Sequence, residues 1–573
     1  MPESDRDSVM EKAIQEFDEI TRDSSKVQRE TLKRILEENG ETEYLQNLGL
    51  KGRTDIESYR ACVPLVTHKD IAPYIQRIVD GDNSKILTGK PVTSISLSSG
   101  TTQGKPKYLL FNEELVLNTM EIYRLSYAFR NREFPLEKGR ALQFIYGSKQ
   151  LKTNGGLTLT TATTNVYLSS QFKSTLKSIQ SQCTSPDEVI FCPDFLQSLY
   201  CHLLCGLLYK DQVQFISATF AHSLVVAFQS FEKDYLELIN DVRTGVLSNK
   251  ITNTIIRTAV SEILHPNPEL ADEIFKICKG LSNWYGVIQE IWPNCKYVYG
   301  IMTGTMEHYT RKLKHYAGTL PLVCSEYGSS EGWIGSVVDP KKPPESACFA
   351  IVPDIGFFEF IPLKNNDDDG NCEPVGLTEV QVGEEYEIII TTFAGLYRYR
   401  LGDILRVEGF YNSTPLVKFM CRKNLILTIN IDKNTEKDLQ LVIDEASKLL
   451  SAEKLDLLDY TSYGDVSSGP GHYVIFWELN SQAKDEVLQN CCDCMDRTFI
   501  DAGYMGSRKT GAIGPLELRV VEKGTFRKIL YYYLSCGTSV GQFKTPRCVG
   551  ACKIVLDILN EGVVERVFSR VYD

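Results

Sequence analysis

The sequence contains no long apolar run. Its longest apolar stretch, near residues 199–208, is far shorter than the roughly 20 residues that a helix needs to cross a bilayer. Its amino terminus, MPESDRDSVMEKAIQEF, is acidic and amphipathic, whereas a secretory signal begins with basic and then apolar residues. We therefore expect a cytoplasmic protein that has no membrane as a partner.

The sequence also has fewer basic than acidic residues. The chain has 62 Lys and Arg against 74 Asp and Glu, which gives a net charge of -12 at pH 7. Nucleic-acid surfaces obtain most of their binding from clustered lysine and arginine, and no basic run interleaved with aromatic residues is present. The composition argues against a nucleic-acid partner and favours small-molecule substrates. It leaves the oligomeric state open, a monomer included.

Histidine is scarce, with seven residues in 573, and these offer no obvious catalytic triad. The 17 cysteines lack the short, loop-rich context of a disulfide scaffold, so we predict free thiols. Residues 491–494 contain a C-x-x-C pair, but no second pair follows at zinc-finger spacing. The flanking segment 484–499 favours an amphipathic helix over a metal or redox site.

The chain is long enough for more than one domain, and its 43% hydrophobic content is ordinary for a globular protein. Apolar residues at helical spacing predict one or two opening helices over 8–40. The middle of the chain alternates predicted strands over 187–191, 213–219 and 297–302 with predicted helices over 196–208 and 223–243. Such alternation predicts mixed, largely parallel sheets covered by helices.

From Phe349 onward the pattern changes to short strands separated by turns. Strands are predicted over 357–361, 385–391 and 404–408, with the acidic loop 365–370 as a solvated hairpin tip. A capping sequence at 431–435 precedes a predicted helix over 436–450, and we place a domain boundary near Leu427. In the carboxy-terminal part we predict strands over 472–479 and 516–521 and helices over 482–502 and 524–535.

Hydroxyl groups, glycines and lysines are concentrated in SSGTTQGKPK, residues 98–107, directly after the strand-like run 92–97. Glycines let the backbone turn its N–H groups inward, hydroxyls add donors, and lysines neutralise anionic oxygens. This composition is typical of a phosphate cradle, with a plain loop as the alternative. It is not a Walker A loop, because three residues rather than four separate Gly100 from Gly104 and Pro106 resists a following helix.

Two later segments place acidic and aromatic residues in turns: YGSSEGW at 327–333 and YRYRLGD at 397–403. Phosphate donors, then an acidic and aromatic turn, then a terminal Asp, in that order, resemble the layout of adenylate-forming enzymes. These enzymes form the acyl-CoA synthetase and luciferase superfamily, whose members activate a carboxylate by making an acyl-adenylate.

Five motifs together resemble the plant Gretchen Hagen family of acyl acid amido synthetases. They are SSGTTQGKPK, TATTNVY at 161–167, YGSSEGW, FAGLYRYRLGD at 393–403 and GQFKTPRC at 541–548. Within the family the chain is most similar to the jasmonate-amido synthetases, which join jasmonic acid to isoleucine. The resemblance implies an ATP-dependent ligase that uses Mg²⁺ and releases AMP and pyrophosphate.

The resemblance also refines the predicted fold. It is α/β, with a large N-terminal adenylation domain over 1–427, built of mixed, largely parallel sheets covered by helices plus a β-rich subdomain. A small, mobile C-terminal α/β lid domain follows over 428–573.

Other functions stay open at this point. A relative of the same class would conjugate auxin (indole-3-acetate) or a benzoate to aspartate or glutamate. A thioester-forming CoA ligase is a further enzyme alternative, and an inactive hormone-binding or interaction protein is a non-enzymatic one. The intact motifs argue against loss of activity, but the sequence does not settle which acid or amino acid is used.

The resemblance implies a role for each motif residue at the nucleotide. The triphosphate is expected at Ser98, Ser99, Gly100, Thr101, Thr102 and Lys105, with Lys107 nearby. The nucleotide is expected to be bordered by Thr163, Thr164, Asn165 and Tyr167, its adenine by Tyr327, Gly328 and Ser329, and its ribose by Asp403, with Arg422 and Lys423 near the phosphates from a hinge.

Two residues are expected to act in catalysis. Glu331 is the expected Mg²⁺ ligand, because magnesium prefers carboxylate and phosphate oxygens. By resemblance, Lys544 swings over the site to stabilise the pentavalent phosphorus, then moves away when the amine enters.

The resemblance also implies the substrate contacts. The walls of an apolar acid pocket are expected from Leu115 and Thr119, on a helix over 113–129, with Thr219, Phe220 and Trp333. The amino acid is expected at Ser99, Thr161 and Thr163, with Lys523, Gly524, Thr525, Phe526 and Arg527 contributing from the second domain.

Overall fold

The computed structural model describes residues 3–102, 105–148, 150–169, 182–192, 194–363, 373–423, 425–430, 432, 434–467, 469–536, 538, 541, 543–550 and 552–572. For residues 3–7, 98–102, 105–106 and 425 the description covers the backbone alone. Predicted residues outside these ranges, the acidic loop 365–370 among them, lie outside the described part of the chain.

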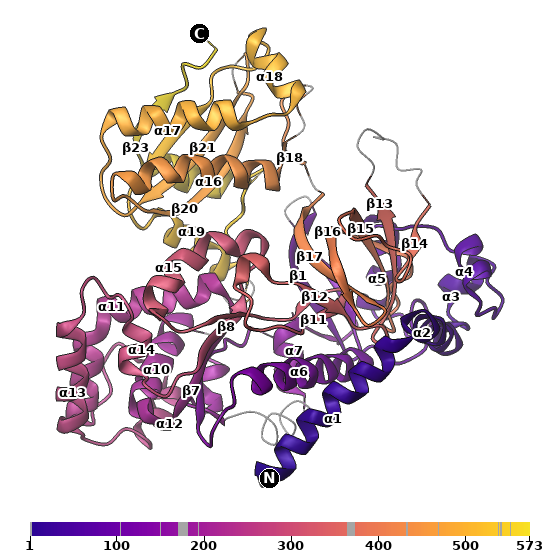
Figure 1. Cartoon of the computed structure of the whole chain (residues 1–573), viewed down its shortest axis with the longest axis horizontal. Helices are drawn as coiled ribbons and strands as arrows, with labels where there is room; N and C mark the ends of the chain where they lie inside the picture. The colour runs from indigo at the N-terminus through magenta and orange to yellow at the C-terminus, as the bar shows by residue number, and fades with distance from the viewer. Residues whose placement is uncertain are drawn as a thin grey trace.

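The chain opens with helices, as predicted: α1 (Glu3–Arg22), α2 (Ser24–Asn39), α3 (Glu43–Asn47), α4 (Ile56–Cys62) and α5 (His68–Val79). Helix α1 lies along α6 (Glu113–Glu133), and α2 packs against the β-rich region (Figure 1). The α2 N-cap is Asp23, whose carboxylate accepts the Lys26 N–H, which satisfies one of the free donors at the helix start.

A five-stranded parallel sheet forms the centre of the N-terminal region. Its order is β6 (Gln182–Cys183), β3 (Arg140–Phe144), β7 (Val213–Phe220), β8 (Tyr297–Ile301) and β9 (Leu322–Cys324). Every strand pair in this sheet is parallel. The accompanying helices are α9 (Asp187–Ile190), α10 (Phe195–Leu208), α11 (Ala221–Thr244), α12 (Thr254–Ser261), α13 (Pro268–Gly280), α14 (Val287–Ile291) and α15 (Glu307–Ala317). The predicted βα alternation is confirmed.

One predicted strand is wrong. Residues 187–190 form helix α9 and Phe191 is its C-cap, with Pro186 at the N-cap and Asp187 and Glu188 in the first turn. Acidic side chains at a helix start are favoured by the helix dipole, and this signal outweighs the three-residue apolar run that suggested a strand.

Two further sheets complete the N-terminal region. A mixed sheet has the order β2 (Lys105–Phe111), β1 (Ser94–Thr102), β5 (Thr158–Thr161) and β4 (Leu151–Lys152), and α7 (Ala162–Leu168) follows β5. An antiparallel sheet has the order β10 (Tyr327–Ser329), β11 (Gly332–Val337), β12 (Phe349–Ile351), β17 (Thr414–Arg422), β16 (Tyr399–Tyr411), β15 (Glu385–Thr391), β13 (Phe357–Pro362) and β14 (Val375–Gly376). The predicted β-rich region is confirmed.

The C-terminal region contains a four-stranded sheet that is covered on both faces. Its order is β20 (Leu457–Asp465), β21 (His472–Leu479), β22 (Glu517–Val521) and β23 (Val563–Phe568). Alternate residues of β21 join two different cores. One core contains α16 (Glu436–Ala452) and α17 (Asp485–Thr498), and the other α19 (Thr525–Ser535) and α20 (Lys553–Glu561). In Figure 1 this region sits beyond α15 at one end of the molecule.

The predicted helix over 482–502 is interrupted. Helix α17 ends at Thr498, and α18 (Ala502–Lys509) begins after Asp501, whose carboxylate accepts the Tyr504 N–H at 2.8 Å. A short ribbon of β18 (Leu425–Leu427) and β19 (Asn434–Thr435) joins the two regions. The domain boundary near Leu427 stays a prediction.

None of the described helices is both long enough and apolar enough to cross a membrane. Every cysteine in the described ranges is a free thiol, as predicted.

Candidate active site

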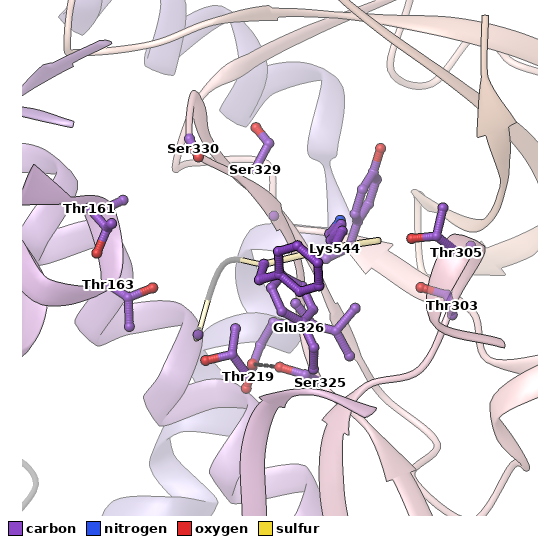
Figure 2. A pocket seen from close by; sticks show the side chains of 18 of the residues that line it. Thr161, Thr163, Thr219, Thr303, Thr305, Ser325, Glu326, Ser329, Ser330 and Lys544 are labelled. Carbon is purple, nitrogen blue, oxygen red and sulfur yellow. Dashed lines mark hydrogen bonds between the residues drawn. The ribbon is translucent and has the colours of Figure 1, made fainter. Parts of the chain in front are cut away.

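A cavity of about 650 Å³ lies where the three sheets of the N-terminal region meet Gly541 and the C-terminal segment 543–548. Figure 2 shows its labelled side chains facing a common space: Thr161 and Thr163 on one side, Thr303 and Thr305 on the other, and Lys544 between them. The cavity thus unites motifs that are separated by hundreds of residues.

Asp403 and Arg422 are brought together by the pairing of β16 with β17, in which they are opposite each other. Arg422 Nε donates to Asp403 Oδ1 at 3.0 Å, and the Tyr327 hydroxyl donates to Asp403 Oδ2 at 2.8 Å. Burial and the nearby Asp403 carboxylate hold the pKa of Tyr327 well above its usual range, so the phenol stays a donor. A carboxylate has about four acceptor positions, and two remain for adjacent hydroxyl groups.

Glu331 lies in the turn between β10 and β11. It is buried, lines the cavity, and accepts a hydrogen bond from the Tyr399 hydroxyl at 3.3 Å. The same turn needs glycine at 328, because a Cβ there would lie 2.4 Å from Cε3 of Trp333. The glycine lets the indole lie flat against the hairpin and face the cavity.

Lys544 extends over the same space. Its Nζ lies 4.9 Å from the centre of the Phe220 ring, and the side chain is accessible from the cavity. Desolvation by the enclosing protein and the like charge of Arg422 lower the pKa of Lys544 to about 8, although Asp403 and Glu436 act in the opposite direction. A cation with this pKa is still mostly charged at pH 7 and needs an anionic partner.

The loop that carries Lys544 is anchored by a hydrogen-bond network between the two regions. Asp459, Thr545 and Arg547 come from the C-terminal region, and Thr305 and Tyr309 from the N-terminal region. Arg547 Nη1 donates to Asp459 Oδ1 at 2.7 Å, while Arg547 Nη2 donates to the Thr305 carbonyl at 3.3 Å. The hydroxyls of Thr545 and Tyr309 donate to Asp459 Oδ2 at 2.7 and 2.8 Å. This network fixes the position of Lys544 relative to the cavity.

The five predicted acid-pocket residues all line the cavity: Leu115, Thr119, Thr219, Phe220 and Trp333. Trp333 Nε1 donates to Thr119 Oγ1 at 2.8 Å, and that hydroxyl donates to the Leu115 carbonyl at 2.6 Å. The indole is therefore held by a hydrogen bond as well as by packing, which fixes the shape of an apolar wall.

The residues of TATTNVY separate into two groups. Thr161, Thr163 and Tyr167 line the cavity, whereas Thr164 and Asn165 lie outside its lining. The Thr164 hydroxyl bonds those of Thr161 and Ser148, each at 2.9 Å, and Asn165 Nδ2 donates to Ser96 Oγ at 3.1 Å. These two side chains are already occupied in holding α7 against neighbouring segments.

The segment 523–527 does not line the cavity. The N–H groups of Gly524 and Phe526 donate to Glu478 at 2.8 and 2.9 Å, which anchors the start of α19. Thr525 is buried, and Lys523 and Arg527 are exposed. The predicted contact of these residues with the amino acid stays a prediction.

The phosphate motif falls on a hairpin. Strand β1 continues through 98–102 and pairs with β2, after a register shift between Leu97 and Thr101. The predicted side-chain contacts of Ser98, Ser99, Gly100, Thr101, Thr102 and Lys105 lie outside the described residues. The adjacent Lys107 is half-buried, on the strand that follows.

The cavity also contains polar residues that the motifs did not indicate: Arg130, Gln143, Ser217, Tyr299 and Glu326. The available signal was a polar residue inside a buried, mainly apolar strand, such as Ser217 in VQFISATF. Asp459 and Arg547 were missed as partners because 88 residues separate them.

A divalent cation fits this site as a companion of phosphates. In the described part of the chain, no three His, Cys, Asp or Glu residues lie close enough to hold a metal by themselves. Magnesium is usually bound by one or two carboxylates together with substrate phosphates. Among the buried carboxylates of the cavity, Asp403 is paired with Arg422 and Glu326 with Arg130, whereas Glu331 accepts only from the Tyr399 hydroxyl within the described residues and suits that arrangement. In 491–494, Cys491 and Cys492 are buried in α17 as free thiols.

Comparison with known proteins gives consistent matches over the chain. Models of the GH3 family match its N-terminal domain at residues 13–322, its central domain at 349–422 and its C-terminal domain at 437–552. The chain is 61% identical to jasmonoyl-L-amino acid synthetase JAR4 of Nicotiana attenuata, covering 98% of both chains. It is 60% identical to jasmonoyl-L-amino acid synthetase GH3.5 of Oryza sativa subsp. japonica, covering 98% of this chain and 99% of that one.

A solved structure matches over nearly the whole length as well. The AtGH3.15 acyl acid amido synthetase in complex with 2,4-DB superposes with a TM-score of 0.89 at 36% identity, covering 98% of this chain and 97% of that one.

Proposed function

Because this chain belongs to the GH3 family of acyl acid amido synthetases, we propose that it is a jasmonoyl-L-amino acid synthetase. It uses ATP to adenylate jasmonic acid and transfers the acyl group to an amino acid, isoleucine being the proposed acceptor. The observation that carries the proposal is the identity of about 60% with two synthetases of that name over at least 98% of each chain.

In the first proposed step, a carboxylate oxygen of the acid attacks the α-phosphorus of ATP and pyrophosphate leaves. Asp403 accepts hydrogen bonds from the ribose hydroxyls, and Arg422 and Lys544 face the phosphates. Catalysis of this kind consists mainly of positioning and charge neutralisation. Glu331 would hold Mg²⁺, which supplies further neutralisation of phosphate charge. The cationic Lys544 stabilises the charge that develops on the pentavalent phosphorus.

In the second proposed step, the amino nitrogen attacks the acyl carbonyl, AMP leaves with the bonding electron pair, and the nitrogen loses a proton. A lysine placed over the α-phosphate obstructs the approach of the amine. We therefore propose that the region after Leu427 moves between the two steps, through a hinge near Arg422 to Thr428. A few terminal residues that absorb the backbone rotation suffice for such a movement.

A substrate panel tests the function. Purified protein is incubated with ATP, Mg²⁺, jasmonic, indole-3-acetic and benzoic acids and the twenty amino acids, and amides are identified by mass spectrometry. Jasmonoyl-isoleucine with one AMP per amide is the expected main product. Predominant indole-acetyl or benzoyl conjugates of aspartate or glutamate would reject the jasmonate assignment.

Replacement of Phe220 by alanine should raise the KM for jasmonate. Burial of a side chain of this size contributes roughly 1.5 to 3 kcal/mol, which corresponds to about 10- to 150-fold in binding. The KM for the amino acid should change much less, because the ring lies beside Lys544 at the acid wall. Trp333→Ala should act in the same way.

Trp333→Phe is the matched control, since it keeps an aromatic wall and loses only the hydrogen bond to Thr119. Steady-state kinetics for both substrates decide the question. Equal increases in the KM values for jasmonate and for the amino acid would contradict the assignment of Phe220 and Trp333 to the acid pocket.

The adenylation step should lose efficiency above about pH 8. Lys544 is charged below its lowered pKa of about 8 and neutral above it, so kcat/KM for ATP in the free enzyme should fall about tenfold per pH unit beyond that point. Pyrophosphate release without amino acid is the measurement, which avoids titration of the amine. Bound phosphate favours the charged lysine, so the break in kcat should lie at higher pH. A flat kcat/KM profile up to pH 10 would contradict the role of this ammonium.

A further inference from the structure

Three polar side chains form a row across the parallel sheet: Gln143 on β3, Ser217 on β7 and Tyr299 on β8. Gln143 is paired in register with Ser217, and Ser217 with Tyr299. Residues in register on neighbouring strands project from the same face of a sheet. All three line the cavity. Because faces of parallel sheets are normally apolar, the fold itself does not require this polar row.

The polar row has hydrogen-bonding capacity to spare. One bond joins its first two members, from Gln143 Nε2 to Ser217 Oγ at 3.4 Å. Within the described residues, no group takes the second amide hydrogen of Gln143, its side-chain oxygen or the hydroxyl hydrogen of Ser217. Whichever way the amide is turned, it offers one donor and one acceptor to a ligand.

Tyr299 is held as an acceptor by a buried ion pair. Its hydroxyl donates to Glu326 Oε1 at 2.5 Å, and Arg130 Nη1 donates to the same oxygen at 3.1 Å. The Arg130 guanidinium lies 3.9 Å from the centre of the Tyr299 ring. Burial acts to raise the pKa of Glu326, but the Arg130 charge and the hydrogen bonds outweigh it, so that the pKa is lowered.

The charges at this end of the cavity therefore cancel. Glu326 is ionised and neutralises Arg130, and the hydroxyl hydrogen of Tyr299 is committed to the carboxylate. A ligand carboxylate placed here would find no uncompensated cation, and burial of an unpaired charge is costly. A neutral carbonyl or hydroxyl oxygen would find donors in Gln143 and Ser217. A hydroxyl would also find an acceptor in the Tyr299 oxygen. The Ser325 hydroxyl lies 3.2 Å from that oxygen but donates over the shorter distance of 2.6 Å to Glu326 Oε2.

The distance from the polar row to the place of the reacting carboxylate is about the length of the substrate acid. Ser217 precedes Phe220 by three residues on β7, and the register of β7 with β8 shifts between them. Both residues therefore line the cavity, at most roughly 10 Å apart along the strand. The Phe220 ring lies under Lys544, where the acid carboxylate must meet the α-phosphate. An acid bound in this way extends its distal part toward the polar row.

We propose that the polar row is a subsite of the acid pocket that takes a neutral oxygen function, a carbonyl or a hydroxyl, on the part of the acid remote from its carboxylate. This inference rests on the proposed function and adds a specificity element to the same adenylation site. The oxygen accepts a hydrogen bond from the Gln143 amide or the Ser217 hydroxyl. The apolar walls of the acid pocket hold the rest of the acid.

Adenylation kinetics with three acids test the subsite: jasmonic acid, its analogue without the ring carbonyl, and jasmonic acid with a hydroxyl at the end of its tail. In the unmodified protein, at least one oxygen should raise kcat/KM about 10-fold or more over the acid without it, since a site built to bond a substrate oxygen rejects the analogue that lacks it. The analogue identifies a ring-carbonyl contact, and the hydroxylated acid identifies a tail contact.

Gln143→Leu should abolish that ratio, mainly through KM, and Tyr299→Phe should reduce it for the hydroxylated acid only. Gln214→Leu is the matched control, because it makes the same replacement on strand β7 at a residue that lies outside the cavity lining and contacts the Glu137 N–H, so it should affect the three acids alike. ATP binding and thermal unfolding verify that each variant is folded. Amides from all three acids with ratios unchanged in both Gln143→Leu and Tyr299→Phe would reject the subsite alone. Amides from none of them would reject the jasmonate function together with it.

Discussion

Replacement of Lys544 by alanine is expected to slow acyl-adenylate formation by about 100- to 1,000-fold, the range found when one preorganised charge-stabilising donor is removed. The Lys544 ammonium lies over the Phe220 ring and lines the cavity. In the proposed mechanism its strongest interaction is with charge that develops only in the transition state. Such an interaction lowers kcat more than it changes KM.

The measurement is pyrophosphate release from ATP and jasmonate, together with ATP binding by calorimetry. Binding of ATP should remain nearly intact in Lys544→Ala. Asp403→Ala is the contrasting variant: it removes the proposed ribose acceptor and releases Tyr327 and Arg422, so it should weaken nucleotide binding. Pyrophosphate release at the unmodified rate by Lys544→Ala would reject the assigned role.

The sequence predicts the elements whose signals are local. Strand β21 matches its predicted bounds of 472–479 because its alternate residues serve two cores, which gives a continuous apolar run. The start of α16 follows from the capping box of Thr435 and Asp438. At 187–191 two local signals compete. The apolar run predicts a strand, but the acidic residues at the helix start favour the helix that forms.

Tertiary pairings are the part that sequence does not supply. Asp403 was predicted as a site residue because it ends a recognisable motif. Its pairing with Arg422, in contrast, follows from the register of β16 with β17. The polar row is similar, since Gln143 and Ser217 lie 74 residues apart. A serine in a mainly apolar strand is an ordinary occurrence, and only the strand register shows that its neighbours across the sheet are polar too.

Segments near the cavity illustrate a second limit. Thr164 and Asn165 belong to the same motif as Thr161 and Thr163, but the short helix α7 directs them to Ser148 and Ser96 instead of the cavity. A motif specifies which residues are close in sequence. The helical turn then decides which of them reach a ligand.

Arg547→Ala should separate the two chemical steps. Arg547 joins Asp459 and the Tyr460 carbonyl at 2.7 Å to the Thr305 carbonyl of the opposite region, and so holds the Lys544 loop over the cavity. Its removal leaves Asp459 as an unpaired buried carboxylate. Loss of one partner of a buried pair costs about 3–5 kcal/mol. The part of this cost that falls on the arrangement with Lys544 in place comes from the lost contact with the Thr305 carbonyl and from the uncompensated Asp459 charge beside Tyr309.

Arg508→Ala is a matched control for stability. Arg508 Nη2 pairs with the buried Asp496 at 2.7 Å, wholly inside the C-terminal region and away from the cavity. Both variants should lower the thermal unfolding temperature. Only Arg547→Ala should also slow the folded enzyme in adenylation, because only that residue bridges the two regions beside Lys544.

The two half-reactions are then measured apart. Pyrophosphate release from ATP and jasmonate reports the first step, and amide formation from synthetic jasmonoyl-adenylate and isoleucine reports the second. Arg547→Ala should slow the first by at least about 10-fold, since each 1.4 kcal/mol against the required arrangement is a factor of ten. The second should proceed at the unmodified rate or faster, because the amine enters only after Lys544 has moved away. An equal loss in both half-reactions would show that one fixed arrangement of the two regions serves both steps, and would reject the proposed movement.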